Sequence, residues 1–250
     1  MWAGTYFERI KQYLQQNEFD ILCFEEVAGI GTKHGNVDSS IDCFEELKNI
    51  LKNHNGKLAI SQYDSSNPKT GYFGNAIFWH KDFALKSEKT IDLFLRRDPF
   101  PSTAKSFEEV GRNALSLNLE KNNIAFTIIC THLALAGGTK IEQPFQRKQN
   151  KKLISYVKEI KTPFILTGDF NIDASQPSVV ELGKYASNLT KEFNVKNTID
   201  PELHRKWERI KPGFPIDFIF VSRQMKVRQF TVLDSHHLSD HFALTTTVEL

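Results

Sequence analysis

Short apolar runs that end in acidic, amide or histidine side chains recur along this chain, and they constrain its fold more than any other feature. Runs of this kind, bounded by segments rich in Gly, Asn and Ser, are typical of buried β-strands. Strand ends at one rim of a sheet are rigid, so side chains far apart in sequence can converge there. The polar residues of five such segments are Glu25 and Glu26 after DILCF, His132 after FTIICT, Asp169 and Asn171 after FILTG, Asp217 within FPIDFIFVS, and Asp240 and His241 within LSDHFAL.

The remaining pattern predicts an α+β fold in which strands outnumber helices. Apolar residues at helical spacing predict helices at 5–17, 41–54, 146–160, 176–187 and 190–194. Strands are expected at 20–27, 57–63, 74–80, 83–95, 113–120, 124–132, 163–167, 216–222, 226–233 and 242–249. Stretches rich in turn residues predict loops at 28–40, 96–108 and 135–145. Two sheets packed face to face with helices on their outer faces fit this order, and the length suits one domain spanning 1–250.

Composition excludes some classes of protein. The formal net charge is +2, from 32 basic and 30 acidic side chains, so any phosphate-binding potential must be local. No apolar stretch approaches the ~20 residues that span a bilayer, and the polar, amphipathic residues after Met1 lead us to expect no signal peptide. Two of three cysteines, Cys23 and Cys130, lie within apolar runs, which predicts buried free thiols and a reducing, cytoplasmic location. We expect a monomer.

The acidic residues suggest a metal site beside a histidine that is held by a carboxylate. A hard divalent ion such as Mg²⁺ prefers carboxylate oxygens, which Glu26 and Asp240 supply. A histidine held by a carboxylate is a candidate general base or an electrostatic partner of phosphate, and His241 with Asp217 would form that pair. Asp217 stands between two apolar neighbours, so it needs a partner if it is buried.

The other candidates suit water activation and phosphate binding. Asp169 could accept the proton of an attacking water, and Asn171 could orient that water or a phosphoryl oxygen. His132 could donate to a phosphate oxygen or protonate the leaving group. Each segment alone has an ordinary structural alternative: a Gly-Asp-Phe-Asn turn, a solvated strand end at Glu25, or a satisfied core histidine at His132.

Two further segments favour a structural interpretation. Residues 92–107 mix aromatics with arginines and could stack on bases or touch a membrane, but a packed surface loop is favoured. A basic stretch is interpreted as a solvated helix face; its members are Lys140, Arg147, Lys148, Lys151 and Lys152.

Taken in order, the motifs resemble those of the endonuclease/exonuclease/phosphatase superfamily, the deoxyribonuclease I-like proteins. FEEV is similar to the family's Q-E-V motif, with Glu25 in place of the usual Gln. THLAL resembles the family's T-H-L motif, and GDFN has the form found in the family itself. IDFIFVS is similar to the family's I-D-Y-I-x-x-S strand, and LSDHFAL is similar to its terminal S-D-H motif. The matches run from about residue 2 to the end of the sequence.

The resemblance implies a four-layer α/β-β/α sandwich and Mg²⁺- or Mn²⁺-assisted hydrolysis of a phosphodiester or phosphomonoester. The roles that it implies are metal binding by Glu26 and Asp240, positioning of nucleophile and phosphate by Asp169 and Asn171, orientation of His241 by Asp217, and phosphate contact by His132. Arg112 resembles a family basic position near the phosphate, and a solvated arginine at a strand start is the alternative.

The start of the sequence departs from the family pattern. Family members begin with a strand that ends in an asparagine of the metal site, whereas Met1-Trp2-Ala3-Gly4 is similar to the segment just after it. We therefore expect that the first strand is missing, with a vacant strand position in the inner sheet and a weakened metal site.

The resemblance leaves the substrate open. A phosphodiester, cleaved by a nuclease or a related phosphodiesterase, is the first expectation. Hydrolysis of a lipid or phosphoinositide ester is an alternative. A non-catalytic scaffold, or an inactive truncated form of the fold, is the alternative from another class.

Overall fold

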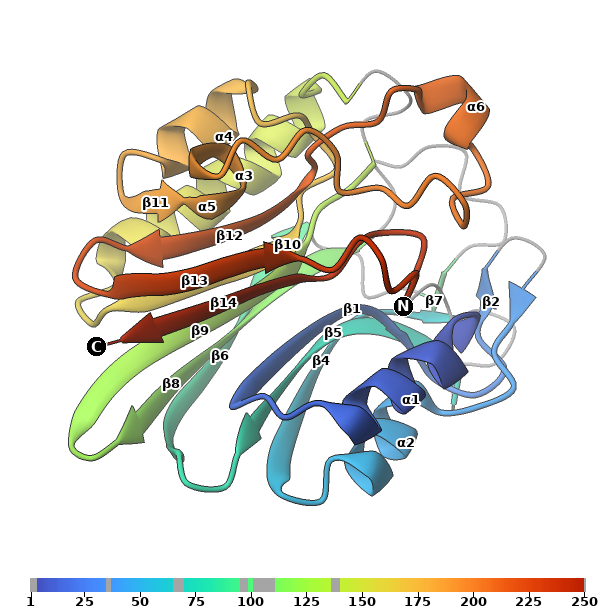
Figure 1. Cartoon of the computed structure of the whole chain (residues 1–250), viewed down its shortest axis with the longest axis horizontal. Helices are drawn as coiled ribbons and strands as arrows, with labels where there is room; N and C mark the ends of the chain where they lie inside the picture. Colours follow the sequence, from blue (N-terminus) through green and yellow to red (C-terminus); the bar gives the residue numbers. More distant parts are fainter. Residues whose placement is uncertain are drawn as a thin grey trace.

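A six-stranded sheet forms one of the two inner layers of the molecule (Figure 1). The computed structural model describes residues 4–34, 37–64, 70–94, 99–100, 111–135 and 140–249. In spatial order the strands are β11 (Ala186–Asn188), β12 (Asp217–Ser222), β10 (Phe164–Asp169), β9 (Ile124–His132), β8 (Arg112–Lys121) and β6 (Ala84–Phe94). Only the β9–β10 pair is parallel among the pairs of this sheet.

The second inner layer consists of two separate pieces. One piece is a four-stranded sheet in the order β1 (Ile21–Ala28), β5 (Tyr72–His80), β4 (His54–Asp64) and β7 (Pro99–Phe100). The other piece is the hairpin of β13 (Lys226–Val232) and β14 (Leu244–Glu249). Within the described part of the chain, β1 pairs with β5 alone and β14 with β13 alone.

Helices cover the outer faces of both layers. Figure 1 shows α1 (Phe7–Gln16) and α2 (Cys43–Ile50) against the four-stranded sheet. It shows α3 (Pro144–Glu159), α4 (Pro177–Leu182) and α5 (Leu189–Glu192) against the six-stranded sheet. The arrangement is the expected four-layer α/β-β/α sandwich of an α+β protein. No helix in the described ranges is long and apolar enough to span a bilayer.

Alternation along the strands divides the core. In β10 the odd-numbered Ile165 packs between the two inner layers, whereas Leu166 packs outward against the α3 side. In β12 Ile219 faces inward and Phe220 outward in the same way. Because side chains two residues apart share a face, Asp169 projects on the same inner side of β10 as Ile165. The inward face of β10 therefore changes from an apolar core residue, Ile165, to the polar Asp169 at the rim of the sheet.

Most expected elements are present, with differences in the shortest ones. The KNN hairpin is formed, and Asn122 and Asn123 both have positive φ, as a tight turn demands. The helix expected over 176–187 is wrong in its second half, because α4 ends at Leu182 and β11 pairs with β12. A small hairpin, β2 (Lys33–His34) with β3 (Val37–Asp38), interrupts the loop expected at 28–40. The helix α6 (Trp207–Ile210) has no counterpart among the expected elements.

The loop expected at 96–108 falls largely outside the described residues, and its residues 99–100 form β7. All three cysteines are free thiols, and Cys130 is buried as expected. The expectation is wrong for Cys23, which is only partly buried because β1 lies at a sheet edge, whereas Cys43 is buried.

Candidate active site

Three polar side chains lie in one row across the rim of the six-stranded sheet. The parallel pairing of β10 with β9 sets Asp169 beside His132, and the antiparallel pairing with β12 sets it beside Asp217. The Nε2 atom of His132 lies 3.6 Å from Oδ2 of Asp169. Register alone therefore brings together residues that are 37 to 85 positions apart, counted from 132 to 169 and from 132 to 217.

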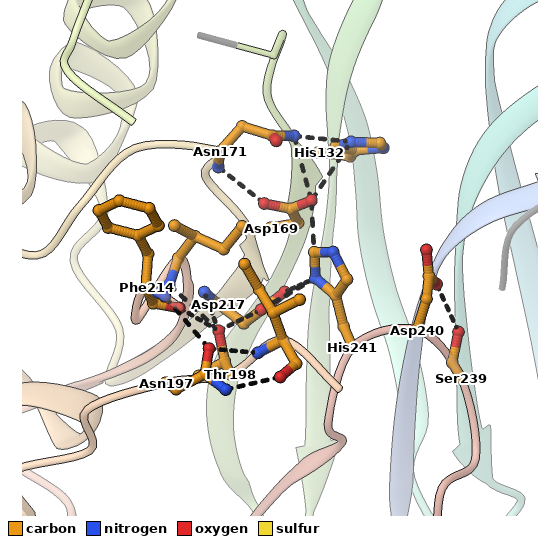
Figure 2. A network of polar contacts seen from close by, with 12 residues as sticks. His132, Asp169, Asn171, Asn197, Thr198, Phe214, Asp217, Ser239, Asp240 and His241 are labelled. Atoms are coloured by element: carbon orange, nitrogen blue, oxygen red, sulfur yellow. Dashed lines mark hydrogen bonds and ion pairs between the residues drawn. The ribbon is translucent and has the colours of Figure 1, made fainter. Parts of the chain in front are cut away.

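The segment after β10 folds back onto Asp169. Asn171 has φ 54°, and its backbone N–H donates to Asp169 Oδ1 at 2.7 Å. Its side-chain Nδ2 donates to Asp169 Oδ2 at 3.0 Å and lies 3.2 Å from His132 Nε2 (Figure 2). The Nζ atom of Lys140 donates to Asn171 Oδ1 at 3.0 Å. Asn171 therefore holds the Asp169 carboxylate by two hydrogen bonds and accepts a further one from Lys140.

A glycine makes this close approach possible. Gly168 has φ 152°, and a Cβ atom on it would lie 1.9 Å from the carbonyl oxygen of Thr131 on β9. No side chain fits in that space, so the Gly-Asp sequence is required by the packing of β10 on β9.

His241 is held by Asp217 on the other side of the row. Its Nδ1 lies 3.0 and 3.1 Å from the two Asp217 oxygens and 3.9 Å from Asp169 Oδ2 (Figure 2). Thr198 Oγ1 donates to Asp217 Oδ2 at 2.5 Å. A β-bridge between Ile199 and His241 ties this loop to the segment before β14. The expectation that Asp217 has a partner is met by both Thr198 and His241.

The electrostatics of this row favour a protonated histidine and a weakly acidic aspartate. Burial acts to lower the pKa of His241, but Asp217, Asp169 and Asp240 raise it well above its ordinary value. Burial first, and then the charge of Asp217, raises the pKa of Asp169 to about 7, against the opposing effects of His241 and Lys140. Near neutral pH the site therefore holds an imidazolium beside a carboxyl group that can take up a proton.

The two glutamates of β1 have different positions. The pairing of β1 with β5 shifts register between Phe24 and Val27, and Glu26 has φ 55°, which marks a β-bulge. Glu25 continues the inward-facing side of β1 and accepts a hydrogen bond from Cys130 Sγ at 3.5 Å. Burial first, and then Asp217 and Asp169, raise the pKa of Glu25 to about 7. Glu25 therefore belongs to the buried acidic group of the site, not to a solvated strand end.

Arg112 lies at the start of β8, close to the same acids. Burial lowers its pKa, whereas the charges of Glu26 and Asp169 act to raise it. Its Nε atom is buried with no hydrogen-bond partner among the described residues. The buried Nε atom does not fit the alternative of a solvated arginine, and the guanidinium lies near the acids of the site.

Two groups of side chains have metal-binding geometry. One ligand atom from each of Asp169, Asp217 and His241 lies within 4.8 Å of the others, and the same holds for His204, Asp240 and His241. Asp240 accepts from Ser239 Oγ at 3.1 Å. Among the described residues Glu26 belongs to neither group. The first group has two carboxylates and lies near Glu25, and this donor set fits a hard divalent cation, whereas the second group has two histidines and one carboxylate.

Sequence reasoning missed several residues of the site. Lys140 was expected on a solvated helix face; that is wrong, because it precedes α3 and its side chain is only 5% exposed. Its backbone oxygen accepts from Asp173 N–H at 2.9 Å, which draws it toward the β10 turn. Thr198 and His204 lie in a loop without a strand pattern, so nothing in the sequence indicated them. Burial, and then His241, lower the pKa of His204 to about 4.

Comparison with known proteins defines the class. A model of the endonuclease/exonuclease/phosphatase family matches residues 3–241, so the chain belongs to that family. Among solved structures, the endonuclease/exonuclease/phosphatase from Bacteroides vulgatus has a TM-score of 0.71 at 21% identity, covering 99% of this chain and 91% of that one. A mannosyl-6-phosphatase from Bacteroides thetaiotaomicron has a TM-score of 0.70 at 18% identity, over 99% and 92%.

A third similar structure is the catalytic domain of human nocturnin with a bound sulfate anion, with a TM-score of 0.67 at 20% identity, over 97% and 86%. These likenesses establish the shared fold. No curated protein sequence matches the chain.

Proposed function

We propose that this protein is a divalent-metal-dependent hydrolase of phosphate esters, with Mg²⁺ or Mn²⁺ as its cofactor. One observation carries the proposal: His132, Asp169 and Asp217 stand side by side at the sheet rim, with Asn171 and His241 bonded to them. Acid, amide and imidazole groups in this arrangement can activate a water and hold a phosphoryl group.

The donor set supports the choice of cation. Burial, and then the charges of Asp217 and Asp169, raise the pKa of Glu25, so these three acids form one group. A divalent ion bound by Asp240 and the neighbouring acids would polarise the phosphoryl oxygen and stabilise the leaving group. Glu26, near Arg112, remains part of this proposal as a further oxygen donor.

Asp169 is the better candidate for the general base. Its pKa of about 7 lets it be ionised at neutral pH and still accept a proton from water. His241, protonated by its contact with Asp217, is suited to stabilise phosphate charge. In this proposal Asp169, and not the His241–Asp217 pair, acts as the base.

The remaining polar groups are arranged to hold an anion. Asn171 and His132 lie beside Asp169, and Lys140 and Arg112 add largely buried positive charge. Burial lowers the pKa of Lys140, against the effects of Asp169 and Asp217. A phosphate group bound here would exchange its hydration water for hydrogen bonds to side chains that the protein already holds in place.

A phosphodiester is the proposed substrate class, as for a nuclease or a related phosphodiesterase. Solved structures of similar fold include a mannosyl-6-phosphatase, which by its name acts on a phosphomonoester, and nocturnin, which binds sulfate, a tetrahedral anion like phosphate. Those observations keep a monoester as the second candidate.

The test is hydrolysis of bis-p-nitrophenyl phosphate and p-nitrophenyl phosphate by the purified protein with Mg²⁺. Asp169→Asn and His241→Ala are expected to lower kcat/KM by about 10²–10⁴-fold. Two exposed residues of the loop before β14 supply matched controls, Asp234→Asn and His236→Ala, which should retain activity. Activity on neither ester, with or without Mn²⁺, would favour the non-catalytic alternative. Full activity in Asp169→Asn would refute the assignment of the base.

A further inference from the structure

The strand β9 leaves the six-stranded sheet at His132, where it has a neighbour on one side only. Among the described residues its pairing with β8 ends at Thr131, whereas its pairing with β10 continues to His132 and sets it beside Asp169. The ends of strands open more readily than their middles, because fewer hydrogen bonds hold them. The position of His132 therefore depends on what holds the residues that follow it.

The first of these residues, Leu133, is held by the turn after β10. Its N–H donates to the carbonyl oxygen of Asp169 at 2.9 Å, and its carbonyl oxygen accepts from Asn171 Nδ2 at 3.2 Å. The same Nδ2 atom contacts Asp169 Oδ2 and His132 Nε2 (Figure 2). A shift of the Leu133 backbone would therefore also disturb the contact between Asn171 and His132.

The second residue, Ala134, is held by two glutamines of α3. Gln149 Oε1 accepts from Ala134 N–H at 3.2 Å, and Gln146 Nε2 donates to the carbonyl oxygen of Ala134 at 2.6 Å. Residues three apart on a helix lie on the same face, so one face of α3 reaches both backbone groups of this residue. We call these two glutamines and their bonds to Ala134 the amide clamp.

The amides of α3 occupy positions where packing alone would favour apolar side chains. The buried face of this helix consists of Gln146, Gln149, Asn150, Leu153, Ile154 and Val157. The last three pack in the apolar core, whereas the three amides are each fully buried. A buried amide costs free energy unless its polar atoms are paired, and Gln149 Nε2 has no partner among the described residues. Burial therefore does not explain these amides, whereas their bonds to the end of β9 do.

We propose that Gln146 and Gln149 are positioning residues of the candidate active site, which hold the end of β9 so that His132 stays in contact with Asn171. The proposal rests on the proposed function, which assigns His132 and Asn171 to the reaction. Among the described residues the side chains of both glutamines bond to backbone groups alone, so they act through the backbone. A displacement of about 1 Å in a reacting group can lower a rate by about 10²-fold.

The first experiment compares Gln149→Met with Asn150→Leu. Methionine has the length of glutamine, but its thioether is a weak acceptor, so Ala134 N–H loses its partner. Asn150 is equally buried on the same helix, but its Nδ2 donates to Glu142 Oε1 at 2.8 Å and not to the end of β9. Both variants are expected to lower Tm. Gln149→Met should also lower kcat on bis-p-nitrophenyl phosphate by at least about tenfold, whereas Asn150→Leu should stay within about twofold of the wild type.

Gln149→Glu separates positioning from a purely structural role. Its carboxyl group keeps an oxygen that can accept from Ala134 N–H in either protonation state, and it loses only the Nε2 atom that has no partner. A purely structural role predicts that an apolar side chain is tolerated better than a buried acid. Positioning predicts the opposite order for kcat, with Gln149→Glu within about threefold of the wild type. Gln146→Met removes the other bond of the clamp and serves if a variant at Gln149 does not fold.

A second measurement does not depend on catalysis. In protein with isotope-labelled histidine, the NMR signals of the His132 ring report its surroundings, and His132→Gln assigns them. Gln149→Met and Gln146→Met should shift or broaden these signals, whereas Asn150→Leu should leave them unchanged.

The outcomes are distinct. Lower kcat and altered His132 signals in the two methionine variants support the amide clamp. Wild-type kcat and wild-type His132 signals in those variants overturn it, and so does an equal loss of kcat in Asn150→Leu. If the wild type cleaves neither ester, the proposed function fails, and the His132 signals alone decide whether the two glutamines position that ring.

Discussion

Buried carboxyl groups dominate the chemistry of this protein at the scale of single residues. Glu25 lies on the inward side of β1, where its pKa rises to about 7 from the ordinary 4.5. The folded state therefore holds a proton between these pH values that the unfolded chain has already released. Its contribution to stability is fully present below about pH 4.5 and is lost as the pH rises through about 7.

Glu25→Gln is expected to raise the free energy of unfolding at about pH 8 by up to about 3 kcal/mol in the presence of a chelator. The gain should vanish near pH 4, where the wild-type carboxyl group is protonated in both states. Urea titrations at several pH values measure this. The exposed Glu192→Gln should show no such pH dependence. A gain of equal size at both pH values would contradict the burial of an acidic Glu25.

Some of these residues were predictable and others were not, for a physical reason. His132, Asp169 and Asp217 follow or begin apolar runs, and the runs reveal where the strands end. Lys140 and His204 reach the site from irregular segments whose path depends on tertiary contacts, such as the bond from Asp173 to Lys140. The pattern of apolar residues in a sequence indicates where a strand ends, but it does not indicate where a loop lies in space.

At the scale of elements, the contact between β9 and β10 decides whether the site can form. The Gly168 Cα lies so close to Thr131 that a methyl group would meet its carbonyl oxygen. Gly168→Ala is therefore expected to destabilise the fold by more than about 2 kcal/mol, through strain at positive φ and separation of the two strands. Gly183→Ala is the matched control, because Gly183 is in the right-handed helical region with its nearest contact at 3.3 Å.

Thermal unfolding of the two glycine variants measures the difference. Gly183→Ala should lie within about 1 kcal/mol of the wild type. If Gly168→Ala proved equally mild, the close packing of β10 on β9 would be wrong, and with it the register that aligns Asp169 with His132.

Elements were predicted with uneven success, and their length explains the difference. The long strand β8 alternates apolar and polar residues, and β9 is a long apolar run. The turn between them carries Asn122 and Asn123. β11 has only three residues and α6 only four, too few for any period to appear. Their conformations are imposed by pairing with β12 and by packing around Ile210 and Ile216.

At the scale of the whole molecule, the site forms only if the two inner layers stay at a fixed distance from each other, because each layer supplies acidic residues. Glu25 comes from the four-stranded sheet, and Asp169 and Asp217 come from the six-stranded sheet. A buried amide pair joins the two sheets close to this rim. Asn75 Nδ2 on β5 donates to both the backbone oxygen and Oδ1 of Asn113 on β8, each at 3.0 Å.

Sequence analysis could not identify this pair. Nothing in the sequence of β5 or β8 marks Asn75 and Asn113 as partners, and 38 positions separate them. Only the packing of one sheet on the other makes them partners. The same packing lets Asn113 Nδ2 donate back across the layers to the carbonyl oxygen of Ala59 at 3.3 Å.

Asn113→Ala is expected to lower the free energy of unfolding by about 1–3 kcal/mol, because it removes these bonds from groups that stay buried. Asn118→Ala, on the same strand, is the control: its bond to Thr127 lies within one sheet and is partly exposed to water, so its loss should cost less. A double-mutant cycle with Asn75→Ala measures the coupling between the sheets. If the coupling energy were zero, the amide pair would not be what holds Glu25 opposite Asp169 and Asp217. A positive coupling, accompanied by a fall in kcat on bis-p-nitrophenyl phosphate, would show that the separation of the layers is itself a determinant of the reaction.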